Sequence, residues 1–378
     1  MIVAVAREAA GENRVALVPE TVARLIKSGV IVRVERDAGI GASFPDQFYE
    51  SAGAQIAPTK AALLKDADAL VKLGRPSDEE LGALSKGAAV IGFLSPLGAP
   101  QYVERLSKHG VTALSMDAIP RITRAQSMDA LSSQSNIAGY KAVLLAASAL
   151  PKFFPMLTTA AGTIPPAKVL ILGAGVAGLQ AIATARRLGA VVSAYDTRAA
   201  VKEQVQSLGA TFLEIDLGAD AEGAGGYAKE LSAEQIETQR RFMVEHIGAS
   251  DVVITTALVP GRPAPRLITA EAVRAMRPGS VIVDLAAEAG GNCELTQPAR
   301  TAVVEDVTII GVTNLAGSMP YHASQLYSRN VFTLLQHLIK DGKLNFDFAD
   351  EITKGTAITH GGEVTHEPTL AQRAAAVT

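Results

Sequence analysis

The sequence predicts an α/β protein with two doubly wound parallel-sheet domains and a cleft between them. Short apolar runs alternate with helical patterns along most of the chain, which is typical of βαβ units. The 378 residues are enough for two or three domains. Hydrophobic residues make up 48% of the chain and aromatic residues only 4%. Ala, Val, Leu, Ile and Gly therefore form the core, as buried parallel strands allow.

The first third of the chain supplies one such domain. Its expected strands are Ile2–Ala6, Val30–Val34, Ala67–Leu73, Ala88–Leu94 and Val111–Ser115. Its expected helices are Pro19–Ser28, Lys60–Lys65 and Gln101–Lys108. This stretch contains no Gly-x-Gly-x-x-Gly turn, so we do not expect the nucleotide site here.

The second domain begins at Lys168–Leu172, an apolar run typical of a buried strand. Further strands are expected at Val191–Tyr195, Phe212–Ile215, Val252–Thr255, Val281–Leu285 and Val307–Gly311. A helix at 135–150 crosses between the domains, and a helix at 324–340 returns to the first. We therefore expect one discontinuous domain, residues 1–131 with 320–378, and a second domain, residues 132–319.

Composition excludes several classes of protein. The net charge of −3 gives no basic footprint for nucleic acid. A single cysteine, Cys293, excludes an internal disulfide and points to a reducing compartment. No signal peptide or transmembrane segment is expected. None of the six histidines has metal-ligand spacing to cysteine or to another histidine, so no metal site is expected.

The turn Gly173-Ala174-Gly175-Val176-Ala177-Gly178 carries the strongest functional signal. It follows an expected strand and opens an expected helix, Gly178–Leu188, as in Rossmann-like domains. The first glycine permits the tight turn, the second lets backbone amides approach a pyrophosphate, and the third lets helix and strand pack closely. The helix start offers free N–H groups and a positive dipole to phosphates.

An acidic residue, Asp196, ends the next expected strand at a spacing typical of dinucleotide sites. Its carboxylate would accept hydrogen bonds from the adenosine ribose and repel a 2′-phosphate, which favours NAD over NADP. Arg198 nearby points the other way, since an arginine can accommodate that phosphate. The candidate cofactor-binding residues here are Gly173, Gly175, Val176, Ala177, Gly178, Asp196, Thr197 and Arg198.

Three other features have both a functional and a structural interpretation. The glycine-rich segment 217–227 is either a lid over the site or a surface loop. Glu288 follows an expected strand and is interpreted as a solvated loop carboxylate rather than a catalytic acid. Cys293 is interpreted as a structural thiol, because no activating partner is identifiable.

A polar segment, residues 121–134, precedes the crossing helix and is expected to face the cleft between the domains. It contains Arg121, Gln126, Asp129 and several hydroxyl groups. Alternatively it is only a capped helix start, with Ser127 or Ser133 as the N-cap. From the residues alone, both interpretations stay open.

At this segment the sequence resembles a known family. Residues 120–134 are similar to the signature loop of the NAD(H)-binding component of proton-translocating nicotinamide nucleotide transhydrogenase. Further similar stretches are residues 154–163, 225–230 and 288–293, and the resemblance spans nearly the whole chain.

The resemblance implies a peripheral homodimer on the cytoplasmic side of the inner membrane. This component would pass hydride from NADH to NADP⁺ held by a separate NADP-binding component, and membrane subunits would couple the exchange to proton translocation. Arg121, Gln126, Asp129 and Ser132 would serve at the nicotinamide end as the catalytic set, and Tyr227 would lie on a closing loop. Direct hydride transfer needs two rings held about 3–3.5 Å apart without water, and needs no general acid or base.

Alanine dehydrogenase, which shares the fold, is the alternative. Arg14 and Lys72 resemble its substrate-carboxylate arginine and catalytic lysine. That reaction also needs a general acid and base, which the family supplies from a histidine after the strand matching 88–94. Here residues 93–97 contain no histidine, and the nearest, His109, is a helix away. A non-catalytic NAD-sensing module is a third possibility, which would not need the polar segment.

Overall fold

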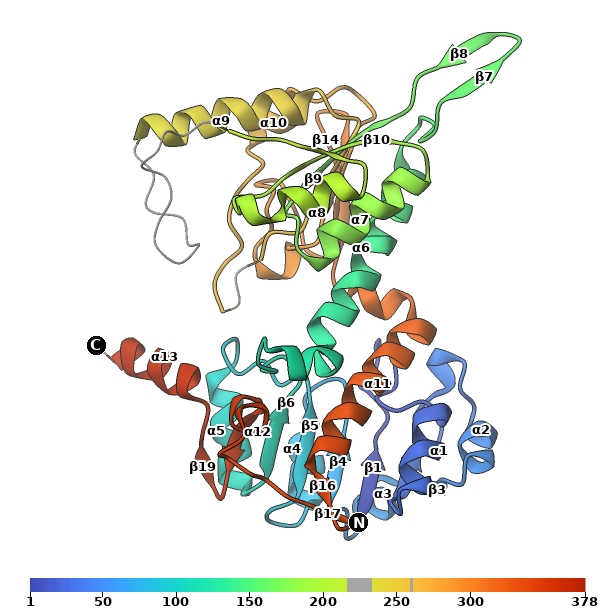
Figure 1. Ribbon diagram of the computed structural model, residues 1–378, viewed down its shortest axis with the longest axis vertical. Helices are drawn as coiled ribbons and strands as arrows, with labels where there is room; N and C mark the ends of the chain where they lie inside the picture. The colour runs from blue at the N-terminus through green and yellow to red at the C-terminus, as the bar shows by residue number, and fades with distance from the viewer. Residues whose placement is uncertain (216–232, 259–260, 378) are drawn as a thin grey trace. The chain divides into compact units, whose positions relative to one another are not determined.

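The structure, a computed structural model, describes residues 1–215, 233–258 and 261–377 (Figure 1). Its internal contacts divide the chain into two compact units. Unit 1 comprises Met1–Gln134 and Ala316–Thr378, and unit 2 comprises Ser135–Leu315. Each unit is a sheet covered by helices, and the two are described separately below.

Unit 1 contains an eight-stranded sheet of order β19-β18-β6-β5-β4-β1-β2-β3. The strands are β1 (Ile2–Val5), β2 (Ile31–Glu35), β3 (Gln55–Ala57), β4 (Ala69–Val71), β5 (Ala89–Gly92), β6 (Thr112–Ser115), β18 (Ala357–His360) and β19 (Glu363–Val364). The six strands β1 to β6 are parallel, and the chain turns from one side of β1 to the other, which makes the sheet doubly wound. β18 and β19 add an antiparallel edge.

Both faces of this sheet are buried. Val3 and Val5 of β1 belong to one hydrophobic cluster, while Ala4 and Ala6 belong to another on the opposite face. The helices of the unit are α1 (Pro19–Lys27), α2 (Asp46–Ser51), α3 (Lys60–Leu64), α4 (Asp78–Ala83), α5 (Pro100–His109), α11 (Pro320–Leu338), α12 (Glu351–Thr356) and α13 (Glu367–Val377). The long helix α11 contributes the fully buried Tyr327 to the cluster on the Val3 side.

Unit 2 contains a seven-stranded sheet of order β11-β10-β9-β12-β13-β15-β14. The strands are β9 (Lys168–Leu172), β10 (Val191–Tyr195), β11 (Thr211–Phe212), β12 (Val252–Thr255), β13 (Val281–Asp284), β14 (Arg300–Val304) and β15 (Val307–Gly311). All pairs are parallel except β14 with β15. The described helices of this sheet are α7 (Val176–Arg187), α8 (Lys202–Ser207), α9 (Ala233–Gly248) and α10 (Ala270–Arg274).

Two small antiparallel pairs lie outside the main sheets. β7 (Leu157–Thr159) pairs with β8 (Gly162–Ile164), and Figure 1 shows this hairpin extending away from the sheet of unit 2. β16 (Ile339–Lys340) pairs with β17 (Lys343–Leu344) in unit 1. Short 3-10 turns include Ile40–Ala42, Thr123–Met128, Ala199–Val201, Ala287–Ala289 and Leu315–Ser318.

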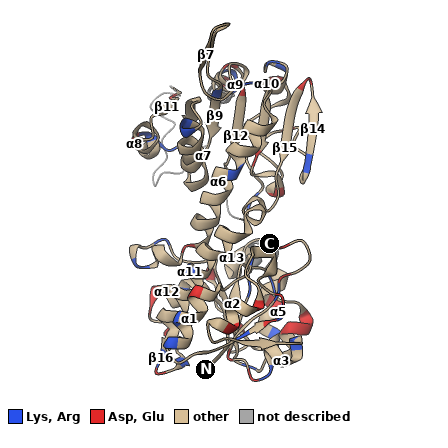
Figure 2. Cartoon of the chain, turned by 90° about the vertical axis from the view of Figure 1, so that its right-hand side faces the viewer, with Lys and Arg blue, Asp and Glu red and all other residues tan. Residues whose placement is uncertain are grey.

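The prediction of two doubly wound α/β domains is confirmed, although both sheets also carry antiparallel edge strands. The crossing helix, α6 (Ala130–Ala149), begins five residues before its expected start at Ser135. The strand expected at Phe212–Ile215 is shorter and ends at Phe212. Among the described residues, no helix is both long enough and apolar enough to cross a membrane. Figure 2 shows that acidic and basic side chains are interspersed over the elements.

Candidate functional site

The three glycines between β9 and α7 occupy three different environments. Gly173 has φ +98°, and a Cβ there would lie 2.6 Å from the Thr256 hydroxyl. A Cβ on Gly178 would lie 1.9 Å from the Gly173 carbonyl oxygen, so only glycine permits this helix and turn to pack so closely. A Cβ on Gly175 would meet nothing within 4 Å. Protein packing therefore requires the first and third glycines, and the space beside the second is left to a ligand.

The start of α7 is open to an anion. Gly175 is its N-cap residue, no side chain caps the helix, and no acidic residue lies in its first turn. The amides at the start of the helix, those of Val176 and Ala177 among them, are thus available to phosphate oxygens, and the helix dipole adds to the attraction.

Asp196 lies directly after β10, beside the glycine turn. Its carboxylate accepts hydrogen bonds from the Ala174 amide at 2.7 Å and from the backbone and guanidinium of Arg198 at 2.9 Å. Burial alone would raise the pKa of Asp196, but the bonds from Arg198 and Ala174 outweigh it and hold the pKa below its usual value. Asp196 is therefore an ionised acceptor at neutral pH, which suits the hydroxyl groups of a ribose.

The turn, the helix start and the carboxylate together fit the phosphates and adenosine ribose of a dinucleotide. Thr197 and Arg198 adjoin the carboxylate, and the Arg198 guanidinium is paired with Asp196 at 2.9 Å. The expected contribution of Tyr227, and the segment 217–227 that carries it, lie outside the described residues.

The polar segment of unit 1 contains the 3-10 turn Thr123–Met128 followed by α6. Arg121 and Gln126 are exposed, while Ala125 and Met128 are buried and fix the turn. Asp129 accepts hydrogen bonds from the Ser132 amide at 2.9 Å and the Ser132 hydroxyl at 2.6 Å. The structure therefore brings Asp129 and Ser132 together at the helix start.

This geometry corrects the capping expected from sequence. Asp129, rather than Ser127 or Ser133, satisfies the amides at the start of α6. Ser133 instead donates its hydroxyl to the Ala130 carbonyl and to the Asn330 side chain. Asn330 in turn donates to the Ser127 carbonyl at 2.9 Å and so ties the turn to α11.

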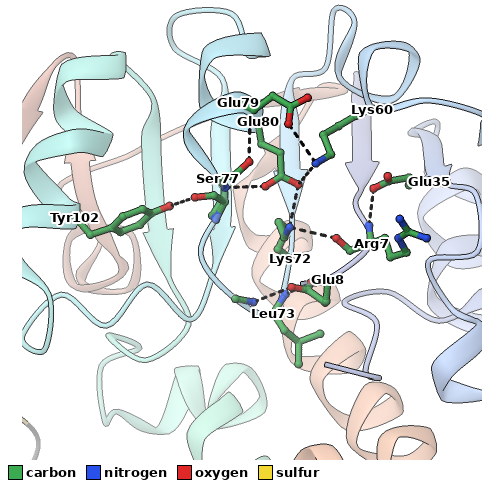
Figure 3. A network of polar contacts seen from close by, with 12 residues as sticks. Arg7, Glu8, Glu35, Lys60, Lys72, Leu73, Ser77, Glu79, Glu80 and Tyr102 are labelled. Atoms are coloured by element: carbon green, nitrogen blue, oxygen red, sulfur yellow. Dashed lines mark hydrogen bonds and ion pairs between the residues drawn. The ribbon is translucent and has the colours of Figure 1, made fainter. Parts of the chain in front are cut away.

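The two cations that resemble a substrate site for an amino acid are paired within unit 1. Arg14 binds both carboxylate oxygens of Glu12, at 2.8 and 2.6 Å, and the Gln134 side chain at 2.8 Å. The buried Lys72 ammonium binds Glu80 at 2.9 Å and the Arg7 carbonyl at 3.2 Å (Figure 3).

Burial raises the pKa of Glu80, but bonds from the Ser77 amide and the Lys72 ammonium outweigh it and lower the pKa overall. Lys72 thus faces an ionised carboxylate of its own chain. The neighbouring Glu8 accepts the amides of Leu73 and Gly74, and its pKa is raised, chiefly by burial (Figure 3).

The other candidates of unit 2 have structural environments. Glu288 is exposed and accepts the Asn314 amide at 2.7 Å. Cys293 is fully buried, and burial raises the pKa of its thiol, as suits a structural cysteine. Within residues 1–215, 233–258 and 261–377, no group of three His, Cys, Asp or Glu side chains could hold a metal ion.

Sequence reasoning missed two polar side chains beside these sites, Glu80 and Asn292. Glu80 neutralises Lys72, and Asn292 is fully buried next to the end of β12. Asn292 lies in a glycine-rich stretch just after β13, and this position at the carboxyl end of a parallel strand is the signal that could have drawn attention to it.

A doubly wound parallel sheet with this turn and carboxylate defines a dinucleotide-binding protein of the Rossmann class. Two family models match the chain, the N-terminal domain of alanine dehydrogenase/PNT at residues 4–138 and the C-terminal domain at residues 142–367. The chain belongs to the alanine dehydrogenase/PNT family.

The similar proteins carry two kinds of name. The first portion of the split NAD(P) transhydrogenase subunit alpha of Rhodospirillum rubrum is 48% identical, over 96% of this chain and 97% of its own length. The crystal structure of transhydrogenase from Sinorhizobium meliloti has a TM-score of 0.85 at 46% identity, over 97% of this chain and 100% of that one. Alanine dehydrogenase 1 of Staphylococcus aureus is 30% identical, over 97% of this chain and 95% of its own length.

Proposed function

We propose that this chain is the NAD(H)-binding subunit of an NAD(P) transhydrogenase, an oxidoreductase that moves hydride from NADH to NADP⁺. The observation that carries the proposal is the glycine turn with the ionised Asp196, in a chain 48% identical to a transhydrogenase subunit over nearly its full length. NADP(H) is held by a separate partner component, and membrane subunits couple the exchange to proton translocation.

The dinucleotide site in unit 2 holds NAD(H) by its phosphates and adenosine. Amides of the turn from Gly173 to Gly178, with those of Val176 and Ala177, bind the pyrophosphate. Asp196 accepts the ribose hydroxyls, and Thr197 and Arg198 flank it. Because a 2′-phosphate would meet an ionised carboxylate, this site selects NAD over NADP.

The polar segment of unit 1 serves the nicotinamide end. The bound dinucleotide supplies the hydride, and no protein group has to gain or lose a proton. Arg121 and Gln126, both exposed, orient the carboxamide end and the partner's nucleotide. Asp129 and Ser132 are fixed on each other, so they present a rigid polar edge. The contribution of these residues is positioning and exclusion of water.

The alternative, an amino-acid dehydrogenase, requires free cations for the substrate and a titrating acid/base. Lys72 is instead paired with Glu80 at 2.9 Å, and Arg14 with Glu12 at 2.6 Å. A dehydrogenase would turn over with pyruvate, ammonium and NADH alone, whereas a sensing module would turn over with nothing. We expect no turnover in that mixture.

The subunit works as a homodimer, peripheral to the membrane on its cytoplasmic side through its partners. Exposed apolar side chains near the β7–β8 hairpin support self-association, since monomeric proteins seldom expose such clusters. Phe153 is 54% exposed, Met156 61% and Ile164 43%.

The decisive experiment mixes the purified chain with NADH and an NADP⁺ analogue and follows absorbance, with and without a cognate NADP-binding component. Hydride transfer only in the presence of the partner is the expected result. If the chain binds NADH and the partner is folded but no transfer occurs, the proposal is wrong. Turnover with pyruvate and ammonium would support the dehydrogenase instead.

A further inference from the structure

The chain leaving β12 forms one wall of the glycine turn. The Thr256 hydroxyl donates to the Gly173 carbonyl at 3.0 Å, and the Thr256 amide donates to the Leu172 carbonyl at 2.8 Å. A Cβ on Gly173 would lie 3.3 Å from the Ala257 amide nitrogen. The position of Thr256 and Ala257 therefore sets the shape of the turn on the side facing β12.

One buried side chain fixes this segment. The carboxamide of Asn292 accepts the Ala257 amide at 3.0 Å and donates to the Ala257 carbonyl at 2.9 Å. Its second N–H donates to the Pro265 carbonyl at 2.8 Å. Asn292 thus binds both backbone groups of Ala257, as a neighbouring strand would, and both of its N–H donors are used.

Asn292 is itself rigidly held. Its backbone carbonyl accepts the amides of Leu267 at 2.8 Å and Ile268 at 3.0 Å. The next residue, Cys293, donates its amide to the buried Asp284 at 3.0 Å. Asp284 also accepts the Thr255 hydroxyl at 2.9 Å and the Thr296 hydroxyl at 2.7 Å. The loop after β13 is therefore anchored to the end of β12 before Asn292 reaches Ala257.

We infer that Asn292 is a positioning residue for the dinucleotide site. It holds Ala257, and through it Thr256, against Gly173, so that the turn keeps the shape its phosphate-binding amides require. This inference rests on the proposed NAD(H) site. Only an uncharged amide fills the position, because a carboxylate would face the two carbonyl oxygens of Ala257 and Pro265 without a proton to donate.

The test compares Asn292→Ala and Asn292→Asp with a matched control, Thr296→Val. The control removes a hydrogen bond of the same loop to Asp284 but leaves Ala257 untouched. NADH and ADP-ribose affinity are measured by fluorescence titration and calorimetry, and stability by thermal melting. The chain has no Trp, so NADH emission is observed directly.

We expect both Asn292 variants to raise the Kd of NADH and ADP-ribose about tenfold or more, since buried carbonyl and amide groups lose their partner. Thr296→Val should lower Tm yet leave the Kd within about twofold of the wild type. Wild-type affinity in Asn292→Ala, or a Kd that follows Tm equally in all three variants, would overturn the inference.

If the Asn292 variants do not fold, Thr256→Val provides the test, because it removes only the hydroxyl contact to the Gly173 carbonyl. A raised Kd supports the inference, and an unchanged Kd overturns it. If the wild-type chain itself binds no NADH, the proposed function fails, which is a different result from a wild type that binds and variants that bind equally.

Discussion

Gly175 and Gly178 are the same residue in one turn, yet an added methyl group meets different surroundings at each. At Gly178 it would lie 1.9 Å from a backbone oxygen, and at Gly175 nothing lies within 4 Å. Gly175 also has φ −76°, which any residue adopts. Stability and binding should therefore be separable by single substitutions.

We expect Gly175→Ala to keep the wild-type Tm and to weaken NADH binding at least tenfold, because the methyl group takes the space that a pyrophosphate needs. Gly178→Ala should cost about 3 kcal/mol of stability or more, because helix and turn must separate. Thermal melting and NADH titration of both variants provide the check. Equal losses of Tm in the two variants would contradict the distinction.

Gln126 is exposed on a turn that Ala125 and Met128 fix from below. Shortening it by one methylene in Gln126→Asn should slow hydride transfer to the partner about tenfold or more, since reaction rates depend steeply on positioning. NADH binding should persist, because the glycine turn and Asp196 are unchanged. Rapid-mixing absorbance measures the rate, with Ser127→Ala as the neighbouring control. An unchanged rate in Gln126→Asn would remove Gln126 from the site.

At this scale, local patterns in the sequence predicted some of the site. The glycine turn and Asp196 follow from spacing, because strand, turn and helix are contiguous. Asn292 and its partner Ala257 are 35 residues apart, and no short-range pattern encodes such a hydrogen bond. The Lys72–Glu80 pair also escaped, because an ion pair depends on how β4 and α4 pack rather than on spacing alone.

Among the elements, the central parallel strands were the most predictable. β10, β12 and β15 have the expected limits, since apolar runs buried on both faces have clear ends. The antiparallel edges β14, β18 and β19 and the β7–β8 hairpin were missed. The residues of β14 are partly or fully exposed, so they lack the apolar pattern that marks a strand. The early start of α6 follows from Asp129, whose capping role the sequence left open.

The first residues of β9 and β12 are joined by Asp251. Its carboxylate accepts the Lys168 amide at 2.9 Å and the Lys152 ammonium at 2.6 Å. Burial alone would raise the pKa of Asp251, but these bonds and the charges of Lys152 and Arg277 outweigh it and lower the pKa. Because the pKa is lower in the folded chain, Asp251 adds stability above its unfolded pKa of about 3.9 and loses that contribution as the pH falls through the folded value.

Asp251→Asn should therefore lower the free energy of unfolding at pH 7 by about 1–3 kcal/mol. The difference from the wild type should shrink as the pH falls below about 4, where the wild-type carboxylate becomes protonated. Urea unfolding from about pH 7 to about pH 2.5 measures it, with the exposed pair Lys202–Glu214 tested by Glu214→Gln as a control. A difference that stays constant with pH would show that the charge of Asp251 is not the cause.

For the whole molecule, composition and alternation were enough to predict two doubly wound domains. They could not predict how the chain serves an assembly, because the partner components are other chains. The described surface offers one independent indication, in the apolar side chains Phe153, Met156 and Ile164 around the hairpin of unit 2. Such exposure is costly in water unless another surface covers it.

If a second copy of this chain covers these residues, the double variant Met156→Lys with Ile164→Lys should dissociate the dimer, because two desolvated ammonium groups would oppose association on each side. Sedimentation velocity measures the change, and NADH titration should give the wild-type Kd, since neither residue lies in the glycine turn. Exposed β14 offers a matched control in Val303→Lys, which is 68% exposed in the wild type and should leave the dimer intact. A double variant that still sediments as a dimer would place the interface elsewhere on the subunit, and a wild-type chain that sediments as a monomer would remove the homodimer from the proposal while leaving its NAD(H) site untouched.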